Sequence, residues 1–118
     1  MNGKVSIIGG GHVGMSAAFA MLLKNTVRNL VLYDRDLEKM RGEQLEFQHS
    51  LTFLGTTKII AAESYKDLKD SDVIVFTAGR AQLPGESRLN LVKSNLEVIE
   101  TILPQAIKYS PNSVIIMV

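Results

Sequence analysis

The feature that most constrains this chain is a glycine-rich turn between two apolar segments. Residues 5–8 are mostly apolar and predict a buried strand, and residues 13–23 are apolar on nearly every side, which predicts a buried helix. Between them lies Gly-Gly-Gly-His-Val-Gly, a G-x-G-x-x-G pattern with its glycines at positions 9, 11 and 14. A strand entering such a turn and a helix leaving it predict the start of a βαβ unit.

The rest of the sequence continues this alternation. Apolar or β-prone runs predict strands at residues 30–33, 58–62, 73–77 and 114–118. Helical spacing predicts amphipathic helices at residues 37–54 and 89–107, and Pro104 should kink or restart the second. Residues 65–70 are turn-like or helical, and residues 78–87 form a loop. We therefore expect an α/β fold, a Rossmann-type doubly wound parallel sheet whose fifth strand ends the chain.

Composition excludes several classes of protein. With 118 residues the chain is long enough for one domain, and its net charge of +1 gives no general electrostatic reason to bind nucleic acid or a membrane. It has no cysteine, and no His/Asp/Glu cluster has metal-ligand spacing, so we expect no metal site. No apolar run approaches the roughly 20 residues of a membrane span. Because the first apolar run is also too short for a signal peptide, we expect a cytoplasmic protein.

The glycine pattern assigns each glycine a role toward a dinucleotide. Gly9 would allow the tight turn, Gly11 would let the backbone approach a pyrophosphate, and Gly14 would let the helix pack close to the strand. The pyrophosphate would then lie at the positive end of the helix, on free backbone N–H groups. The loop lacks the Lys-Ser/Thr of an ATPase-type phosphate loop.

An acidic residue lies at the position where a dinucleotide-binding fold binds a ribose. Asp34 follows Gly14 by 20 residues and closes the second predicted strand, so its carboxylate would accept hydrogen bonds from the ribose hydroxyls of NAD. The same carboxylate would repel the extra phosphate of NADP, although the adjacent Arg35 could partly counter that repulsion. His12, inside the glycine loop, is expected to face the cofactor or solvent without a chemical role.

Residues 77–89, Thr-Ala-Gly-Arg-Ala-Gln-Leu-Pro-Gly-Glu-Ser-Arg-Leu, resemble the mobile active-site loop of the L-lactate/malate dehydrogenase family. Gly42-Glu43 with Gln48-His49, and residues 102–104 leading to residues 108–112, agree in the same register. The resemblance covers the whole chain and implies an NAD-dependent L-2-hydroxy-acid dehydrogenase. It implies that residues 1–118 are the NAD-binding part, truncated before a C-terminal part that carries the proton-donating His-Asp pair and a carboxylate-binding arginine. The fragment alone is then expected to be inactive.

The resemblance also implies roles for individual residues. Arg88 would close over the substrate and polarise its ketone carbonyl as the catalytic arginine. Gln82 takes the loop position that sorts substrates, where malate enzymes usually carry arginine, so a lactate dehydrogenase is favoured. Arg80, two residues earlier, keeps a malate dehydrogenase of the lactate-like branch open.

The family pattern extends the cofactor site beyond the glycine loop and Asp34. The further cofactor residues it implies are Val13, Lys39, Tyr65, Thr77, Ala78, Gly79, Arg80, Asn95 and Thr101. The implied partners are a small 2-keto or 2-hydroxy acid and further copies of the chain in a homodimer or homotetramer, with residues 37–54 as a plausible subunit contact. A stand-alone dinucleotide-binding module without chemistry remains a separate alternative.

Overall fold

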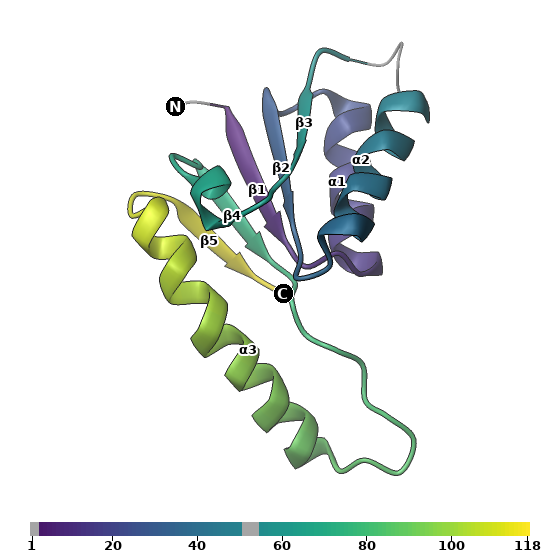
Figure 1. Cartoon of the computed structure of the whole chain (residues 1–118), viewed down its shortest axis with the longest axis vertical. Helices are drawn as coiled ribbons and strands as arrows, with labels where there is room; N and C mark the ends of the chain where they lie inside the picture. The colour runs from purple at the N-terminus through teal and green to yellow at the C-terminus, as the bar shows by residue number, and fades with distance from the viewer. Residues whose placement is uncertain (1–2, 51–54) are drawn as a thin grey trace.

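Five parallel strands form one sheet with helices on both faces (Figure 1). The computed structural model describes residues 3–50 and 55–118. In chain order, the described elements are β1 Lys4–Ile8, α1 His12–Lys24, β2 Asn29–Tyr33, α2 Leu37–Ser50, β3 Lys58–Ala61, the 3-10 helix η1 Tyr65–Leu68, β4 Val73–Phe76, α3 Arg88–Tyr109 and β5 Val114–Met117. The expected α/β class and doubly wound parallel sheet are confirmed.

The strand order is β3-β2-β1-β4-β5, so the chain builds outward from β1 in one direction and then in the other. Ile8, the last residue of β1, lies opposite Tyr33 of β2 and Phe76 of β4, which brings the carboxyl ends of three strands together. Helices α1 and α2 cover one face of the sheet, while η1 and α3 cover the other (Figure 1). The reversal of strand order between β1 and β4 is where open α/β sheets form a ligand crevice.

Each strand divides its side chains between the two faces. Ile7 and Leu32 pack under α1 and α2, whereas Ile8 and Phe76 pack under η1 and α3, and all four are essentially inaccessible to solvent. Because both faces are covered, these strands consist of nearly continuous apolar residues rather than alternating ones. Burial of apolar surface on two faces holds the sheet together.

The sequence predicted that helix α1 would be buried on all sides, but the structure buries only one side of it. Its buried residues are Gly14, Ala18 and Leu22, which follow one another at intervals of four and form a single stripe. Phe19 and Leu23 remain 44% and 47% exposed. A helix lying on one face of a sheet has one contact surface, so apolar residues on its other sides stay in solvent in this structure.

Helix α3 departs from the prediction in how much of its apolar stripe is buried. It continues through Pro104 without restarting, and Ile102 and Ala106 on either side of the proline are its buried residues. The predicted apolar stripe is largely exposed toward the helix start, where Leu89 and Leu96 are 63% and 49% exposed. That half of α3 extends beyond the sheet (Figure 1), whereas packing of the second half holds the helix together around the proline.

Helix α2 follows its predicted stripe closely. Met40 and Phe47 are buried, and Gln44 between them donates a hydrogen bond from Nε2 to the Ile59 carbonyl oxygen at 2.8 Å. The predicted end of this helix, residues 51–54, lies outside the described residues.

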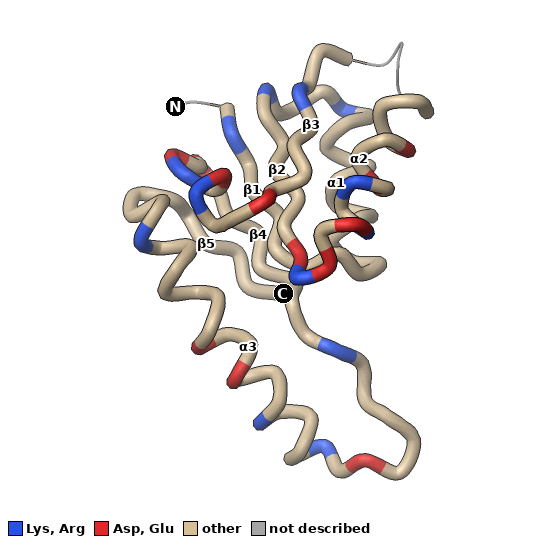
Figure 2. Tube along the Cα trace, in the orientation of Figure 1, with Lys and Arg blue, Asp and Glu red and all other residues tan. Residues whose placement is uncertain are grey.

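Acidic and basic positions occur side by side in the connection from β2 to α2 (Figure 2), which contains Asp34 and Arg35.

Two helical glycines should respond in opposite ways to a methyl group. A Cβ on Gly14 would collide with the Gly9 carbonyl oxygen, so we expect Gly14→Ala to lower the free energy of unfolding by about 1–3 kcal/mol. A Cβ on Gly42 meets nothing within 4 Å, so Gly42→Ala should raise it by about 0.5–1 kcal/mol. Urea unfolding followed by circular dichroism measures both. A Gly14→Ala variant as stable as the parent would contradict the close approach of α1 to β1.

Candidate functional site

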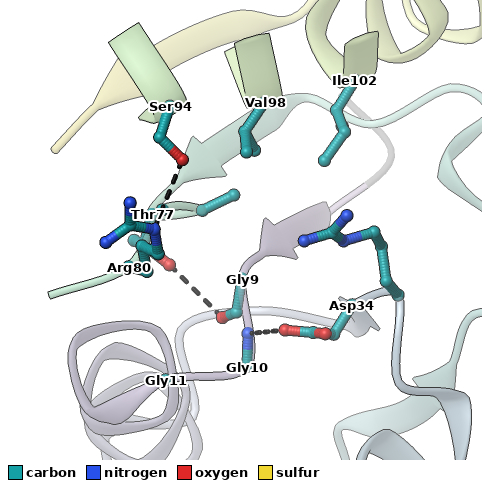
Figure 3. A pocket seen from close by; sticks show the side chains of 12 residues that line it. Gly9, Gly10, Gly11, Asp34, Thr77, Arg80, Ser94, Val98 and Ile102 are labelled. Carbon is teal, nitrogen blue, oxygen red and sulfur yellow. Dashed lines mark hydrogen bonds between the residues drawn. The ribbon is translucent and has the colours of Figure 1, made fainter. Parts of the chain in front are cut away.

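A cleft opens where the carboxyl ends of β1 and β4 meet the start of α1 and the side of α3. Its volume is about 340 Å³. Its lining residues, shown in Figure 3, are Gly9, Gly10, Gly11, Asp34, Arg35, Thr77, Ala78, Gly79, Arg80, Ser94, Val98 and Ile102. Seven of these are residues that the sequence placed at a cofactor site: Gly9, Gly11, Asp34, Thr77, Ala78, Gly79 and Arg80.

The glycine loop is packed tightly against the protein on one side. Gly9 has a φ of +114°, and a Cβ there would lie 2.6 Å from Thr77 Oγ1. A Cβ on Gly10 would collide with the Met40 methyl group and approach Asp34 Oδ2 at 3.0 Å. At Gly9 the positive φ and the contact with Thr77 make glycine a requirement of the fold itself, whereas a side chain at Gly10 would displace the end of the Met40 side chain.

Gly11 differs from its neighbours because a Cβ there would meet nothing within 4 Å. It is the N-cap residue of α1, with extended backbone, and no side chain caps the helix there. Gly11 also lines the cleft, so the start of α1 faces its open space. Backbone N–H groups at the start of a helix attract anions, and a bare backbone lets a phosphate approach them closely. The residues present therefore fit a pyrophosphate.

Asp34 is held rigidly at the end of β2. Its Oδ2 accepts a hydrogen bond from the Gly10 amide at 2.7 Å, and its Oδ1 accepts one from the Asp36 amide at 3.0 Å. Each carboxylate oxygen retains further acceptor capacity, which suits it to hydroxyl groups of a sugar. Figure 3 shows this carboxylate directed at the glycine loop from the opposite side of the cleft to α3.

Thr77 joins the end of β4 to the glycine loop. Its amide donates to the Ile8 carbonyl oxygen at 2.8 Å, and its hydroxyl lies 3.0 Å from that oxygen and 3.3 Å from the Gly9 carbonyl oxygen. Gly79 follows with a φ of +144°, which turns the chain away from the sheet. Asn95 Oδ1 accepts a hydrogen bond from the Arg80 amide at 3.1 Å, so Asn95 supports this turn rather than lining the cleft.

An ion pair organises the loop after β4. The Arg80 guanidinium donates to both carboxylate oxygens of Glu86, at 2.7 and 2.5 Å. The Leu83 amide donates to Glu86 Oε1 at 3.1 Å, and Gln82 Nε2 donates to the Glu86 carbonyl oxygen at 2.7 Å. The guanidinium, followed by the Leu83 amide, lowers the pKa of the Glu86 carboxyl to about 2.

The two residues expected to contact the substrate do not reach the cleft in this structure. Gln82 and Arg88 are exposed, the first in the loop and the second at the start of α3. The loop and the start of α3 extend away from the sheet (Figure 1), so neither residue is among those that line the cleft.

Other predicted cofactor residues lie around the cleft rather than in it. His12 lines a separate groove between α1 and α2, and Val13 is 58% exposed on the first turn of α1. Gly14 is buried against the Gly9 carbonyl oxygen, as a packing residue. Lys39 is exposed on α2. Thr101 lines a smaller cavity of about 240 Å³ that shares Arg35, Ser94, Val98 and Ile102 with the cleft.

Tyr65 lies in η1 and stacks on Tyr33, with ring centroids 4.9 Å apart. Burial, together with the hydrogen bond to Tyr65, raises the pKa of Tyr33 above its ordinary value. The pair packs against the core cluster that contains Ile8 and Phe76. Tyr65 therefore packs on Tyr33 and is not among the residues that line the cleft.

The wall formed by α3 was missed by the sequence analysis. Ser94, Val98 and Ile102 line the cleft at intervals of four residues, one helical face (Figure 3). The spacing of these three residues can be found in the sequence, but the neighbouring stripe of the predicted helix is more apolar and indicates a single contact face. Gly10 and Arg35 also line the cleft and were not assigned to the cofactor site.

Within residues 3–50 and 55–118, no group of three or more His, Cys, Asp or Glu side chains is arranged to hold a metal ion. In the same part of the chain, none of the helices combines the length and apolar character needed to cross a membrane.

Comparison with known proteins identifies a family. Residues 3–118 match the family model described as lactate/malate dehydrogenase, NAD binding domain. The L-lactate dehydrogenase A chain of Cyprinus carpio is 45% identical over 115 residues, which cover 98% of this chain and 34% of the relative. The L-lactate dehydrogenase B chain of Homo sapiens is 44% identical over 117 residues, which cover 99% of this chain and 35% of the relative. The chain thus spans about a third of the length of these curated relatives.

Solved structures agree with the sequence matches. A lactate dehydrogenase enzyme from a Medee basin deep-sea metagenome library superposes with a TM-score of 0.88 at 40% identity, over 98% of this chain and 37% of that one. The minor L-lactate dehydrogenase of Enterococcus mundtii, solved in a ligand-bound form, gives a TM-score of 0.89 at 30% identity, over 97% and 36% of the two chains.

The Arg80–Glu86 pair should be visible in a titration. Carbon-detected NMR of the Glu86 carboxyl should give a pKa of about 2, and Arg80→Gln should move it up toward the ordinary value of 4.5. Because the folded-state pKa is lowered, the pair contributes stability above pH 4.5, and this contribution is lost as the pH falls toward 2. A Glu86 pKa unchanged by Arg80→Gln would contradict the ion pair.

Proposed function

The chain belongs to the lactate/malate dehydrogenase family, and we propose that its cleft binds NAD(H) within an L-2-hydroxy-acid dehydrogenase. In such an enzyme, bound NADH supplies a hydride to the carbonyl carbon of a 2-keto acid. Because the chain spans about a third of its relatives, we assign it the cofactor site and part of the substrate site.

One observation carries the cofactor proposal. In the glycine loop, a Cβ on Gly9, Gly10 or Gly14 would meet protein atoms, whereas a Cβ on Gly11, which lines the cleft, would meet nothing within 4 Å. Glycine at positions 9, 10 and 14 is explained by packing inside this chain. At Gly11 it is explained by close approach of something outside the chain, and the start of α1 favours an anion.

The other lining residues complete a dinucleotide site. Asp34 would accept hydrogen bonds from the ribose hydroxyls on the side of β2, and its charge disfavours the additional phosphate of NADP. Val98 and Ile102 offer an apolar wall from α3. Arg80 lies between Ser94 and the glycine loop (Figure 3), close enough to the cleft to line it.

We propose pyruvate and lactate as the substrate pair, with Arg88 polarising the ketone oxygen and Gln82 selecting against a second carboxylate. The relatives matched are L-lactate dehydrogenases, and Gln82 is uncharged. Both residues lie on the exposed loop and helix start, so a movement of this segment toward the cleft is required to bring them to a substrate.

Malate dehydrogenase is the second candidate, favoured by Arg80 two residues before Gln82. A second substrate carboxylate would need a free guanidinium. In this structure Glu86 engages that of Arg80 through both carboxylate oxygens, so a dicarboxylic substrate would have to displace Glu86. Turnover of pyruvate and oxaloacetate by the complete dehydrogenase discriminates between the two.

Replacing Gly11 should separate binding from folding. Serine is a better N-cap than glycine, so Gly11→Ser should leave stability unchanged or raise it by about 0.3 kcal/mol. Its side chain would occupy the open space, and loss of one charge-assisted hydrogen bond should weaken NADH binding by about tenfold or more. NADH fluorescence titration of the 118-residue chain measures the affinity.

The matched control for Gly11→Ser is Gly42→Ala, whose added methyl group also meets open space but lies on α2 away from the cleft. It should bind NADH as the parent chain does. The parent should also bind NADH more tightly than NADPH. Equal NADH affinities of the parent and Gly11→Ser would remove the glycine loop from the cofactor site.

Arg88→Gln tests the substrate role. In the complete dehydrogenase, we expect the turnover of pyruvate to fall by about 100-fold or more while NADH affinity persists, because a cation aimed at a developing oxyanion acts in the transition state. Arg41→Gln provides the control, since Arg41 forms exposed ion pairs with Glu38 and Glu63. Unchanged turnover after Arg88→Gln would exclude Arg88 from the mechanism.

A further inference from the structure

The guanidinium of Arg80 lies where two different anionic groups could bind it, Glu86 and a ligand in the cleft. Its guanidinium is bound by both oxygens of Glu86, and its Nε donates to Ser94 Oγ at 3.3 Å. The same side chain lines the cleft beside Gly9, Gly10 and Gly11. Arg80 is therefore the basic group on the loop side of the cleft. The start of α1, at the same cleft, attracts anions.

Glu86 is built into the loop more firmly than Arg80. Its side chain is 13% exposed although the loop around it is exposed, whereas that of Arg80 is 41% exposed. Besides the guanidinium, Glu86 Oε1 holds the Leu83 amide at 3.1 Å, and the Glu86 amide donates to the Leu83 carbonyl oxygen at 3.0 Å. Glu86 thus keeps its place in the turn when Arg80 leaves, so Arg80 is the partner able to move.

Resting on the proposed function, we propose that Glu86 is a positioning residue that competes with the cofactor pyrophosphate for Arg80. Without cofactor, Glu86 holds the guanidinium on the loop. When a pyrophosphate enters the cleft, the guanidinium exchanges a carboxylate for a phosphate, two anions it binds in the same bidentate manner. The cost of breaking the Arg80–Glu86 pair then reduces the affinity for the cofactor.

If the exchange occurs, replacing Glu86 by an uncharged residue should increase the affinity for NADH. Glu86→Gln removes the ion pair that holds Arg80, so the Kd of the 118-residue chain for NADH should fall by about two- to fivefold, as expected for an ion pair at the protein surface. A residue that served only to fold the loop would weaken binding when replaced. Arg80→Gln should raise the Kd, and Glu86→Gln should have little further effect in the Arg80→Gln background.

The double-mutant cycle separates exchange from simple charge repulsion. If Glu86 only repelled the pyrophosphate, its removal would tighten binding equally with and without Arg80, and that result would overturn the proposal. Glu100→Gln, which removes one negative charge from the exposed surface of α3 outside the cleft, should leave the Kd unchanged. Circular dichroism melting of each variant verifies that it is folded.

The outcomes also distinguish this inference from the function on which it rests. A parent chain that binds NADH, with Glu86→Gln binding equally or more weakly, would overturn the exchange and leave the cofactor site standing. A parent chain and variants that show no binding of NADH would overturn both. Tighter binding by Glu86→Gln that depends on Arg80 supports the exchange.

Discussion

The structure depends on the close approach of α1 to β1 across the glycine loop. A Cβ on Gly14 would collide with the Gly9 carbonyl oxygen, and a Cβ on Gly9 would press on Thr77, which directly follows β4. This contact lets α1 lie on the sheet with its first turn directed at the carboxyl ends of β1 and β4. The cleft and the exposed start of α1 follow from this contact, and the hydrogen bond from the Gly10 amide holds the Asp34 carboxylate beside them.

The cleft is a balance of rigid and movable parts. Asp34 and Thr77 are fixed by hydrogen bonds to the glycine loop, so the floor of the site exists before any ligand arrives. Such preorganisation spares the cost of ordering side chains on binding. By contrast, Arg80 and Glu86 hold each other on an exposed loop, where an ion pair costs little to break. The fixed side gives the cleft a constant shape, and the movable side can rearrange when a ligand enters.

Much of the fold could be predicted from local patterns. Strand positions followed from short apolar runs bounded by glycine, aspartate or turn residues. The parallel direction of the strands followed from their alternation with helices. Periodicity predicted that α3 would bury one long stripe, yet Leu89 and Leu96 are exposed. The reason is that periodicity reports an amphipathic face but not how much of it meets the sheet, and α3 is longer than the surface it covers. Similarly, Pro104 is tolerated because packing on both sides of it compensates for one lost hydrogen bond.

The sequence by itself determined the fold class and the family, and it predicted the part of the candidate site that depends on spacing between nearby residues. The glycine pattern and Asp34 could be identified because their roles depend on spacing along one βαβ unit. Only the tertiary structure decided the rest of the candidate site. It placed Ser94, Val98 and Ile102 on the cleft wall, stacked Tyr65 on Tyr33, bonded Asn95 to the Arg80 amide, and joined Arg80 to Glu86. Those assignments depend on how a helix crosses the sheet and how a loop folds on itself, which are set by contacts between distant residues.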